Sequence, residues 1–145
     1  MGFLSRLTGG AAPQKSATDD VLLLHGMLLM AGAEGFIDHA EIETVEAYFA
    51  TLPEFKGKQF QDLYQQACKL VARYPNLKDS VKALGDIKSA TVKKKLYVIA
   101  ADLALSSGEV EEAEDELLDT MMRLLNIDDR FAQQVIEVLS VKYTK

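Results

Sequence analysis

Apolar residues recur at three- and four-residue spacing along most of this chain, which is the period of an α-helix. The pattern predicts seven helices, over residues 19–33, 39–52, 58–73, 77–84, 91–106, 112–125 and 129–143. Pro53 and Pro75 follow two of them, and Gly85 is expected in the C′ position that closes the fourth. No alternating run rich in Val, Ile or Thr predicts a strand. The expected fold class is therefore all-α, a single-domain helical bundle of about seven helices.

An internal repeat with an offset of 73 residues connects two parts of the chain. Residues 31–41 read AGAEGFIDHAE and residues 104–114 read ALSSGEVEEAE, so that alanine, glycine, a β-branched residue, an acid and glutamate coincide in order. An apolar helix precedes each glycine and an amphipathic helix follows it. In the first of these apolar helices, one face is expected to carry Val21, Leu24, His25, Leu28 and Leu29. The repeat predicts two pseudo-symmetric helix-turn-helix units, at about residues 19–52 and 91–125.

Length and composition are those of one globular domain. The chain has 145 residues, 48% of them hydrophobic and 26% charged. We expect a flexible N-terminal leader over residues 1–18 and a helical domain over residues 19–145. The apolar run at the start is too short for a signal peptide or a membrane span, although contact of Phe3, Leu4 and Leu7 with a membrane surface stays open. The single cysteine, Cys68, fits a reducing compartment, so a cytoplasmic location is expected.

Charge is distributed in three blocks. Residues 34–54 carry six acids and no Lys or Arg, residues 56–95 carry ten basic and three acidic residues, and residues 109–129 carry nine acids with Arg123 alone. The net charge of -6 argues against a general nucleic-acid binder. The alternation indicates charge complementarity, either within the fold or between copies in a homo-oligomer, or a surface for protein partners.

The two turns resemble those of the TerB-like family, which is named for bacterial tellurite-resistance proteins. The family pattern is an apolar helix ending in Ala-x-x-Asp-Gly, followed by x-Ile/Val-x-x-x-Glu, and Leu124-Leu125-Asn126-Ile127-Asp128 matches its closing stretch. The chain departs from the pattern before each glycine, where Glu34 and Ser107 replace the aspartate. The resemblance implies an all-helical, non-enzymatic module linked to metal or chemical stress. It also implies acidic turns that bind divalent cations.

The turns contain half of a calcium-binding loop, twice. When Gly35 is placed at the glycine position of an EF-hand loop, Asp38 and Glu41 fall on its ninth and twelfth positions, and the second turn repeats this at Glu111 and Glu114. The first and third positions would be Met30 and Gly32, which offer no side-chain oxygen. A tight EF-hand site is therefore excluded, and a weak divalent-cation site is the hypothesis that remains.

Helix capping explains the same acids without a ligand. Asp38 and Glu41 have the spacing of a capping box, and acids in the first turn of a helix favour its dipole. The second turn has more acid than capping needs, because six of the eight residues from Glu109 to Glu116 are acidic. Both interpretations stay open at each turn.

Four further residues carry potential chemistry. Asp102 lies in the apolar run LYVIAADLAL, so it is expected to be hydrogen-bonded, paired or protonated. A bond to a helix start or to a lysine is favoured over a role as metal ligand. His25 is expected to be a satisfied core histidine, and Cys68 an inert small hydrophobe near the apolar stripe of its helix. His39 could join a zinc site with Asp38 and Glu41, but it lacks a second nitrogen or sulfur donor.

No enzyme motif is found in the chain. It has no triad candidate, no glycine-rich phosphate loop and no cofactor fingerprint, so a non-enzymatic role is expected. The favoured function is a TerB-like stress-response module that binds other proteins through its charged surfaces. The alternative is a weak sensor of Ca²⁺, Mg²⁺ or Zn²⁺, for which the candidate metal ligands are Glu34, Asp38, Glu41, Asp102, Glu111 and Glu114.

Overall fold

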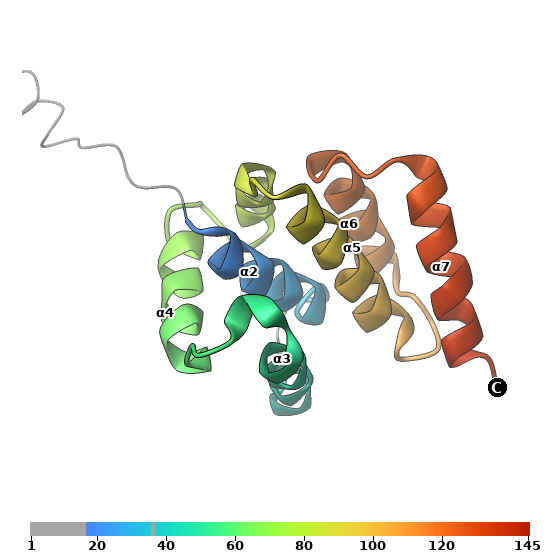
Figure 1. The fold of residues 1–145 in the computed structure, drawn as a ribbon, viewed down its shortest axis with the longest axis horizontal. Helices are drawn as coiled ribbons and strands as arrows, with labels where there is room; N and C mark the ends of the chain where they lie inside the picture. The colour runs from blue at the N-terminus through green and yellow to red at the C-terminus, as the bar shows by residue number, and fades with distance from the viewer. Residues whose placement is uncertain (1–16, 36) are drawn as a thin grey trace, which may run out of the picture.

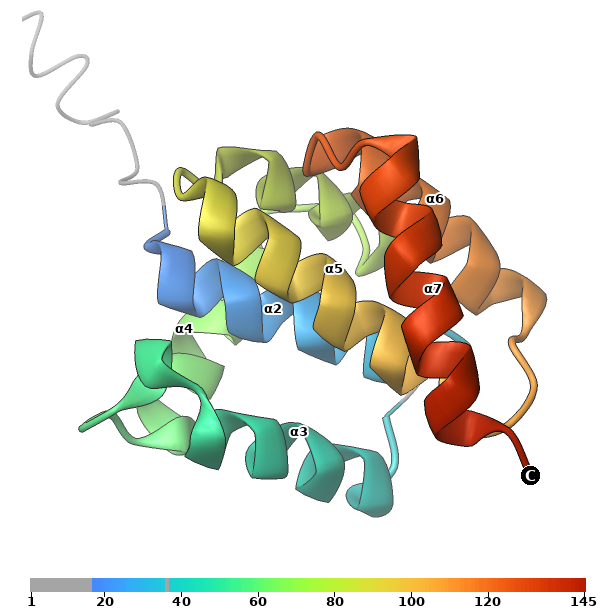
Figure 2. The ribbon, with the colours of Figure 1, turned by 45° about the vertical axis from the view of Figure 1, so that its right-hand side comes forward.

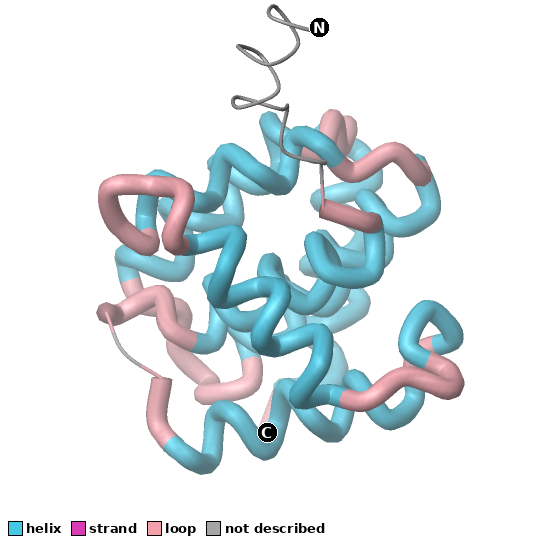
Figure 3. The backbone as a smooth tube through the Cα atoms, turned by 90° about the vertical axis from the view of Figure 1, so that its left-hand side faces the viewer, coloured by secondary structure: helices cyan, strands magenta, loops and turns pink. Residues whose placement is uncertain are grey.

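The computed structural model describes residues 17–35 and 37–145, and across these residues it contains helices and connecting loops but no strand (Figure 3). The described elements are α2 (Asp19–Ala31), α3 (His39–Thr51), η1 (Pro53–Phe55), α4 (Phe60–Val71), η2 (Lys78–Asp86), α5 (Ala90–Leu105), α6 (Glu112–Leu124) and α7 (Asp129–Tyr143). The predicted all-α fold is confirmed, and most predicted helix ends lie within two residues of those observed. The expected leader falls almost wholly outside the described residues.

α2 is the central helix of the bundle. It contacts α3, α4, α5 and η2, and every residue from Val21 to Met30 is buried. The sequence predicted a one-sided apolar face here, but a helix that is apolar all round is covered on all sides. Figure 1 shows α2 and α5 side by side in the middle, with α4 at one edge and α7 at the other.

A glycine sets the close approach of the two central helices. A Cβ atom at Gly26 would lie only 2.5 Å from Cδ2 of Leu96 on α5, and Leu96 is fully buried. The carboxylate of Asp19 joins the same two helices at their starts, because it accepts hydrogen bonds from the backbone N–H groups of Lys88 and Ser89, both at 2.9 Å. Ser89 then caps α5 by accepting from Val92 N at 3.2 Å.

The prediction for Gly85 is wrong, and Cys68 is more exposed than its place near the apolar stripe suggested. The fourth predicted helix is a 3₁₀ helix, η2, which continues through Gly85 to Asp86. Gly85 is not among the described glycines with positive φ, which are Gly35, Gly57 and Gly108, so it is no left-handed C′ residue. Cys68 is exposed, because the buried side of α4 is formed by Leu63, Ala67 and Leu70, and a rotation of about 100° per residue turns Cys68 away from them.

Candidate functional site

The two acidic turns have the same local structure, and the second repeats the first at the 73-residue offset. Gly35 and Gly108 both have positive φ, at 116° and 86°, and helices α3 and α6 begin at the equivalent residues 39 and 112. Among the described residues other than the chain neighbours, no atom lies within 4 Å of the position that a Cβ would occupy at either glycine, so backbone conformation and not space selects glycine there. These local matches agree with the repeat; the pseudo-symmetry of the complete units stays a prediction.

Helix capping is confirmed at the first turn. Asp38 Oδ1 accepts from Glu41 N at 2.8 Å, and Glu41 Oε1 accepts from Asp38 N at 3.0 Å, which together form a capping box. At the second turn Glu114 Oε1 accepts from Glu111 N at 2.9 Å. These acids therefore satisfy backbone amides at the starts of α3 and α6 that no helical carbonyl can reach.

Carboxylates from both turns lie close enough to repel one another. Partial burial raises the pKa of Glu114, and the negative charges of Glu34, Glu111 and Glu41 raise it further, while the hydrogen bond from Glu111 N acts in the opposite direction. Figure 2 shows the two turns on the side of the bundle where the C-terminus lies. The structure thus brings together acids that stand more than seventy residues apart in sequence.

The predicted metal ligands form two groups. Glu34, Glu41 and Glu111 lie close enough to Glu114 for their charges to raise its pKa, whereas Asp102 makes none of its hydrogen bonds with these acids. In residues 17–35 and 37–145, no three His, Cys, Asp or Glu side chains are placed so that they could hold a metal ion together. With these side-chain conformations, the acidic turns are close neighbours and not a formed coordination shell.

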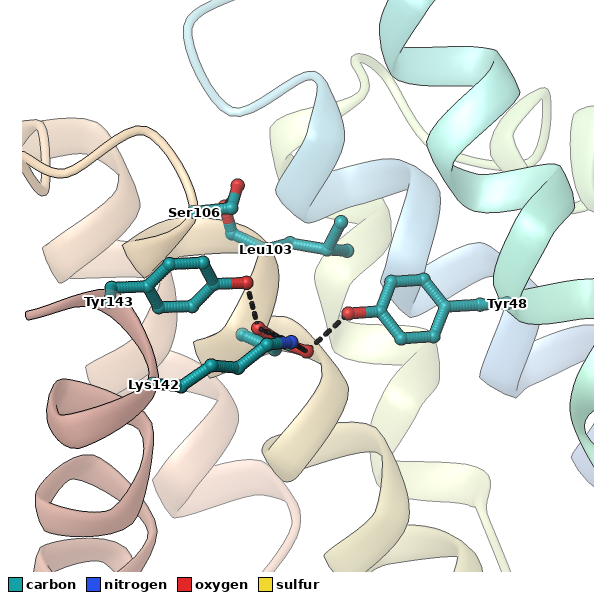
Figure 4. Close-up of polar contacts among 6 residues, drawn as sticks. Tyr48, Leu103, Ser106, Lys142 and Tyr143 are labelled. Carbon is teal, nitrogen blue, oxygen red and sulfur yellow. Dashed lines mark hydrogen bonds and ion pairs between the residues drawn. The ribbon is translucent and has the colours of Figure 1, made fainter.

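Asp102 is the centre of a polar cluster formed by three helices. It lies on α5, is only 8% exposed, and accepts hydrogen bonds from the hydroxyls of Tyr48 on α3 and Tyr143 on α7 (Figure 4). Lys142 Nζ lies 3.0 and 3.1 Å from its two carboxylate oxygens. The expectation of a lysine partner is confirmed, and the two tyrosine donors were not predicted.

The cluster keeps Asp102 ionised. Burial acts to raise its pKa, but the hydrogen bonds from Tyr143, Tyr48 and Lys142 outweigh burial, and the pKa lies below its ordinary value. The pKa of Tyr48 is raised by burial and by the neighbouring carboxylate, so its hydroxyl keeps its proton and acts as a donor. A charged carboxylate with three donors from two other helices holds α3 and α7 to α5.

The two histidines have separate roles. His25 is buried, and its Nε2 lies 3.1 Å from the carbonyl oxygen of Ser80 on η2, which confirms a satisfied core histidine. Burial lowers the pKa of His25, against the opposing effect of that hydrogen bond. His39 is highly exposed and pairs with Glu43 at 3.0 Å, one turn along α3, and not with Asp38 or Glu41.

Comparison with protein-family models shows which family the chain belongs to. The family model described as "Tellurite resistance protein TerB" matches residues 21–136, which span α2 to the middle of α7. The chain belongs to the TerB family. The match includes both acidic turns and Asp102, so the predicted family resemblance is confirmed over most of the helical domain. Comparison with curated proteins and with solved structures gives no match.

In this TerB domain, sequence reasoning missed the partners of Asp102. Tyr48 stands 54 positions before it, and Lys142 and Tyr143 stand 40 and 41 positions after it. The apolar surroundings of Asp102 indicated that some donor must exist, but no short motif connects residues at such separations.

No described helix combines the length and the apolar character needed to cross a membrane.

Proposed function

We propose that this TerB domain is a non-enzymatic interaction module whose acidic turns bind a basic surface of a partner protein. One observation carries the proposal: the charged blocks of the chain are hardly neutralised within the fold. Among the described residues, only Lys95–Glu54, at 2.7 Å, joins the basic block to an acidic one. No salt bridge of the described residues uses an acid from the block 109–129.

A basic partner would relieve repulsion that the domain itself leaves in place. Glu114 is partly buried and lies near three other carboxylates, which is why its pKa is raised. A lysine or arginine of the partner would stabilise all four negative carboxylates at once. The helices that adjoin these carboxylates are already formed, so binding would not require them to fold. Because Glu34 and Glu111 are exposed and Glu41 and Glu114 are only partly buried, such binding is expected to weaken as ionic strength rises.

A second candidate is a weak divalent-cation site formed by the same acids. The convergence of Glu34, Glu41, Glu111 and Glu114 favours it, because carboxylate oxygens are the preferred ligands of Ca²⁺ and Mg²⁺. Side chains would have to rotate to surround the ion, since no described group is arranged to hold one. The affinity is therefore expected to be low.

One NMR experiment tests both candidates. ¹⁵N-labelled protein is titrated with CaCl₂, MgCl₂ and ZnCl₂, and separately, in EDTA, with a lysine- and arginine-rich peptide as probe. The variants are Glu111→Gln/Glu114→Gln and a matched neutralisation elsewhere, Asp62→Asn/Glu137→Gln, on α4 and α7.

Saturable peptide shifts around Gly35 and Gly108, weakened by salt and lost only in the first variant, would support the interaction module. Saturable shifts at the same amides with a metal ion would support the cation site. Equal shifts in both variants would show a diffuse charge effect and would overturn both candidates.

A further inference from the structure

A groove on the described surface borders the first acidic turn, and Gly32, Ala33 and Gly35 contribute to its lining. It has a volume of about 740 Å³ and lies between the C-terminal end of α2, the start of η2 and one face of α6. Its apolar lining consists of Leu29, Ala33, Leu77, Val81, Ala113 and Leu117. Leu77 is 38% exposed and is one of three large apolar side chains exposed among the described residues. The volume lies within the range of pockets that enclose a drug-sized ligand.

The groove has an acidic edge. Glu116 and Asp119 line it from α6, and neither forms a salt bridge among the described residues. Arg123 lies one turn farther along α6, where its guanidinium is 3.4 Å from Thr120 Oγ1. An apolar segment with one basic residue near its anchors would match this combination of lining and edge.

We propose that the groove binds the chain's own N-terminal segment, residues 3–7, which reads Phe-Leu-Ser-Arg-Leu. Phe3, Leu4 and Leu7 supply three large apolar anchors, and Arg6 supplies the positive charge for Glu116 and Asp119. Residues 1–18 contain Arg6 and Lys15 and no acid, so the whole segment is complementary in sign to that edge. The inference goes beyond the proposed function, because it concerns this groove and its edge and not the carboxylates of Glu34, Glu41, Glu111 and Glu114.

The connecting chain is long enough to reach the groove. The structure places the start of α2 beside Lys88, where η2 has just ended, because Asp19 binds the backbone of Lys88. The groove lies at the opposite end of both elements. α2 has 13 residues, which is about 20 Å at 1.5 Å per residue. The ten-residue step from Leu7 to Ala17 spans at most about 35 Å when extended, which exceeds the distance required.

Other occupants fit the groove less well. An anionic lipid surface would be repelled by Glu116 and Asp119, and a flat bilayer does not fill a concave site. In a second copy, the exposed large apolar side chains outside the groove, among the described residues, are Val138 and Val141 on α7, and they would bring the neighbouring Glu137 towards the same acidic edge. Binding of the chain's own segment needs no loss of translational freedom, which favours it further.

Paramagnetic relaxation tests the proposal in the full chain. Cys68, the exposed cysteine, is changed to serine, and Thr8→Cys carries a nitroxide label just beyond the proposed anchors. The expected result is a loss of most signal intensity at the amides of Ala33, Val81 and Leu117, independent of protein concentration. The control, Phe3→Ser/Leu7→Ser with the same label, is expected to restore these signals.

Charge reversal gives a second measurement that does not depend on the apolar core. Arg6→Glu and Glu116→Lys/Asp119→Lys alter exposed rim residues or the leader, so folding is expected to be kept. Each change alone should reduce the paramagnetic loss of signal at the groove amides. Arg6→Glu combined with Glu116→Lys/Asp119→Lys should bring that loss of signal back.

Equal intensities in the labelled protein and its control would overturn the proposal. A loss seen only when ¹⁵N protein is mixed with labelled ¹⁴N protein would overturn it in favour of a second copy. A loss that depends on added phosphatidylglycerol vesicles would overturn it in favour of a lipid surface.

Discussion

Removing single donors from Asp102 should loosen the junction of α3, α5 and α7 by measurable amounts. Tyr48→Phe deletes one hydrogen bond to a buried, charged acceptor, and such bonds contribute about 1.5–3 kcal/mol. Because Tyr48 is itself only half-buried, we expect a loss near 1.5 kcal/mol in the free energy of unfolding. Tyr143→Phe, at the end of the last helix, should cost about 1 kcal/mol.

The remaining variants of this cluster separate charge from hydrogen bonding. Lys142→Met should cost about 0–1 kcal/mol, because the lysine side chain is 54% exposed and solvent screens its charge. Asp102→Asn keeps the shape but loses the charge and one acceptor, so about 2–3 kcal/mol is expected. Urea unfolding followed by circular dichroism measures each value, with an unchanged m-value as the check on two-state behaviour.

A matched control defines the result that would refute this reasoning. Tyr74→Phe removes a hydroxyl that is absent from the side-chain hydrogen bonds of the described residues, so it should change the free energy of unfolding by less than about 0.5 kcal/mol. If Tyr48→Phe and Tyr143→Phe were as mild as this control, the cluster would not hold the three helices together.

The pH dependence of stability gives a further check on the cluster. Because the folded pKa of Asp102 lies below the ordinary 3.8, its stabilisation is present above that pH and is lost as pH falls through the folded value. Asp102→Asn should lack this part of the acid transition.

Three further predictions follow from the fold. Gly26→Ala should lower the free energy of unfolding by about 1–2 kcal/mol, since overpacking against buried Leu96 outweighs the helix propensity gained; a melting temperature at or above that of wild type would contradict the close approach of α2 and α5. The folded pKa of His25 lies below 6.5, so the unfolded chain binds the extra proton and stability should fall as pH drops below about 6.5; urea midpoints between about pH 5 and 7.5 should show a weaker slope in His25→Gln. Asp38→Ala should cost about 1 kcal/mol by removing the cap of α3, and Asp38→Asn or Asp38→Ser, which keep an acceptor, should restore most of it in thermal unfolding.

The sequence alone determined the helices and their ends where the cause is local. The capping acids Asp38 and Asp128 stand directly before α3 and α7, and α7 begins and ends at the predicted residues. Caps, prolines and left-handed glycines act over three or four residues, so a short window of sequence contains the whole interaction. The acidic turns with Gly35 and Gly108 were predicted for the same reason.

Only the tertiary structure decided which surfaces are covered and which distant residues meet. The sequence predicted one apolar face on the first helix, but α2 is buried all round because α3, α4, α5 and η2 surround it. Gly85 lies inside η2, and Cys68 is exposed, since packing and not composition selects the buried side. The partners of Asp102 and the approach of Glu34 and Glu41 to Glu114 depend on how the helices cross, and that geometry is a property of the whole core.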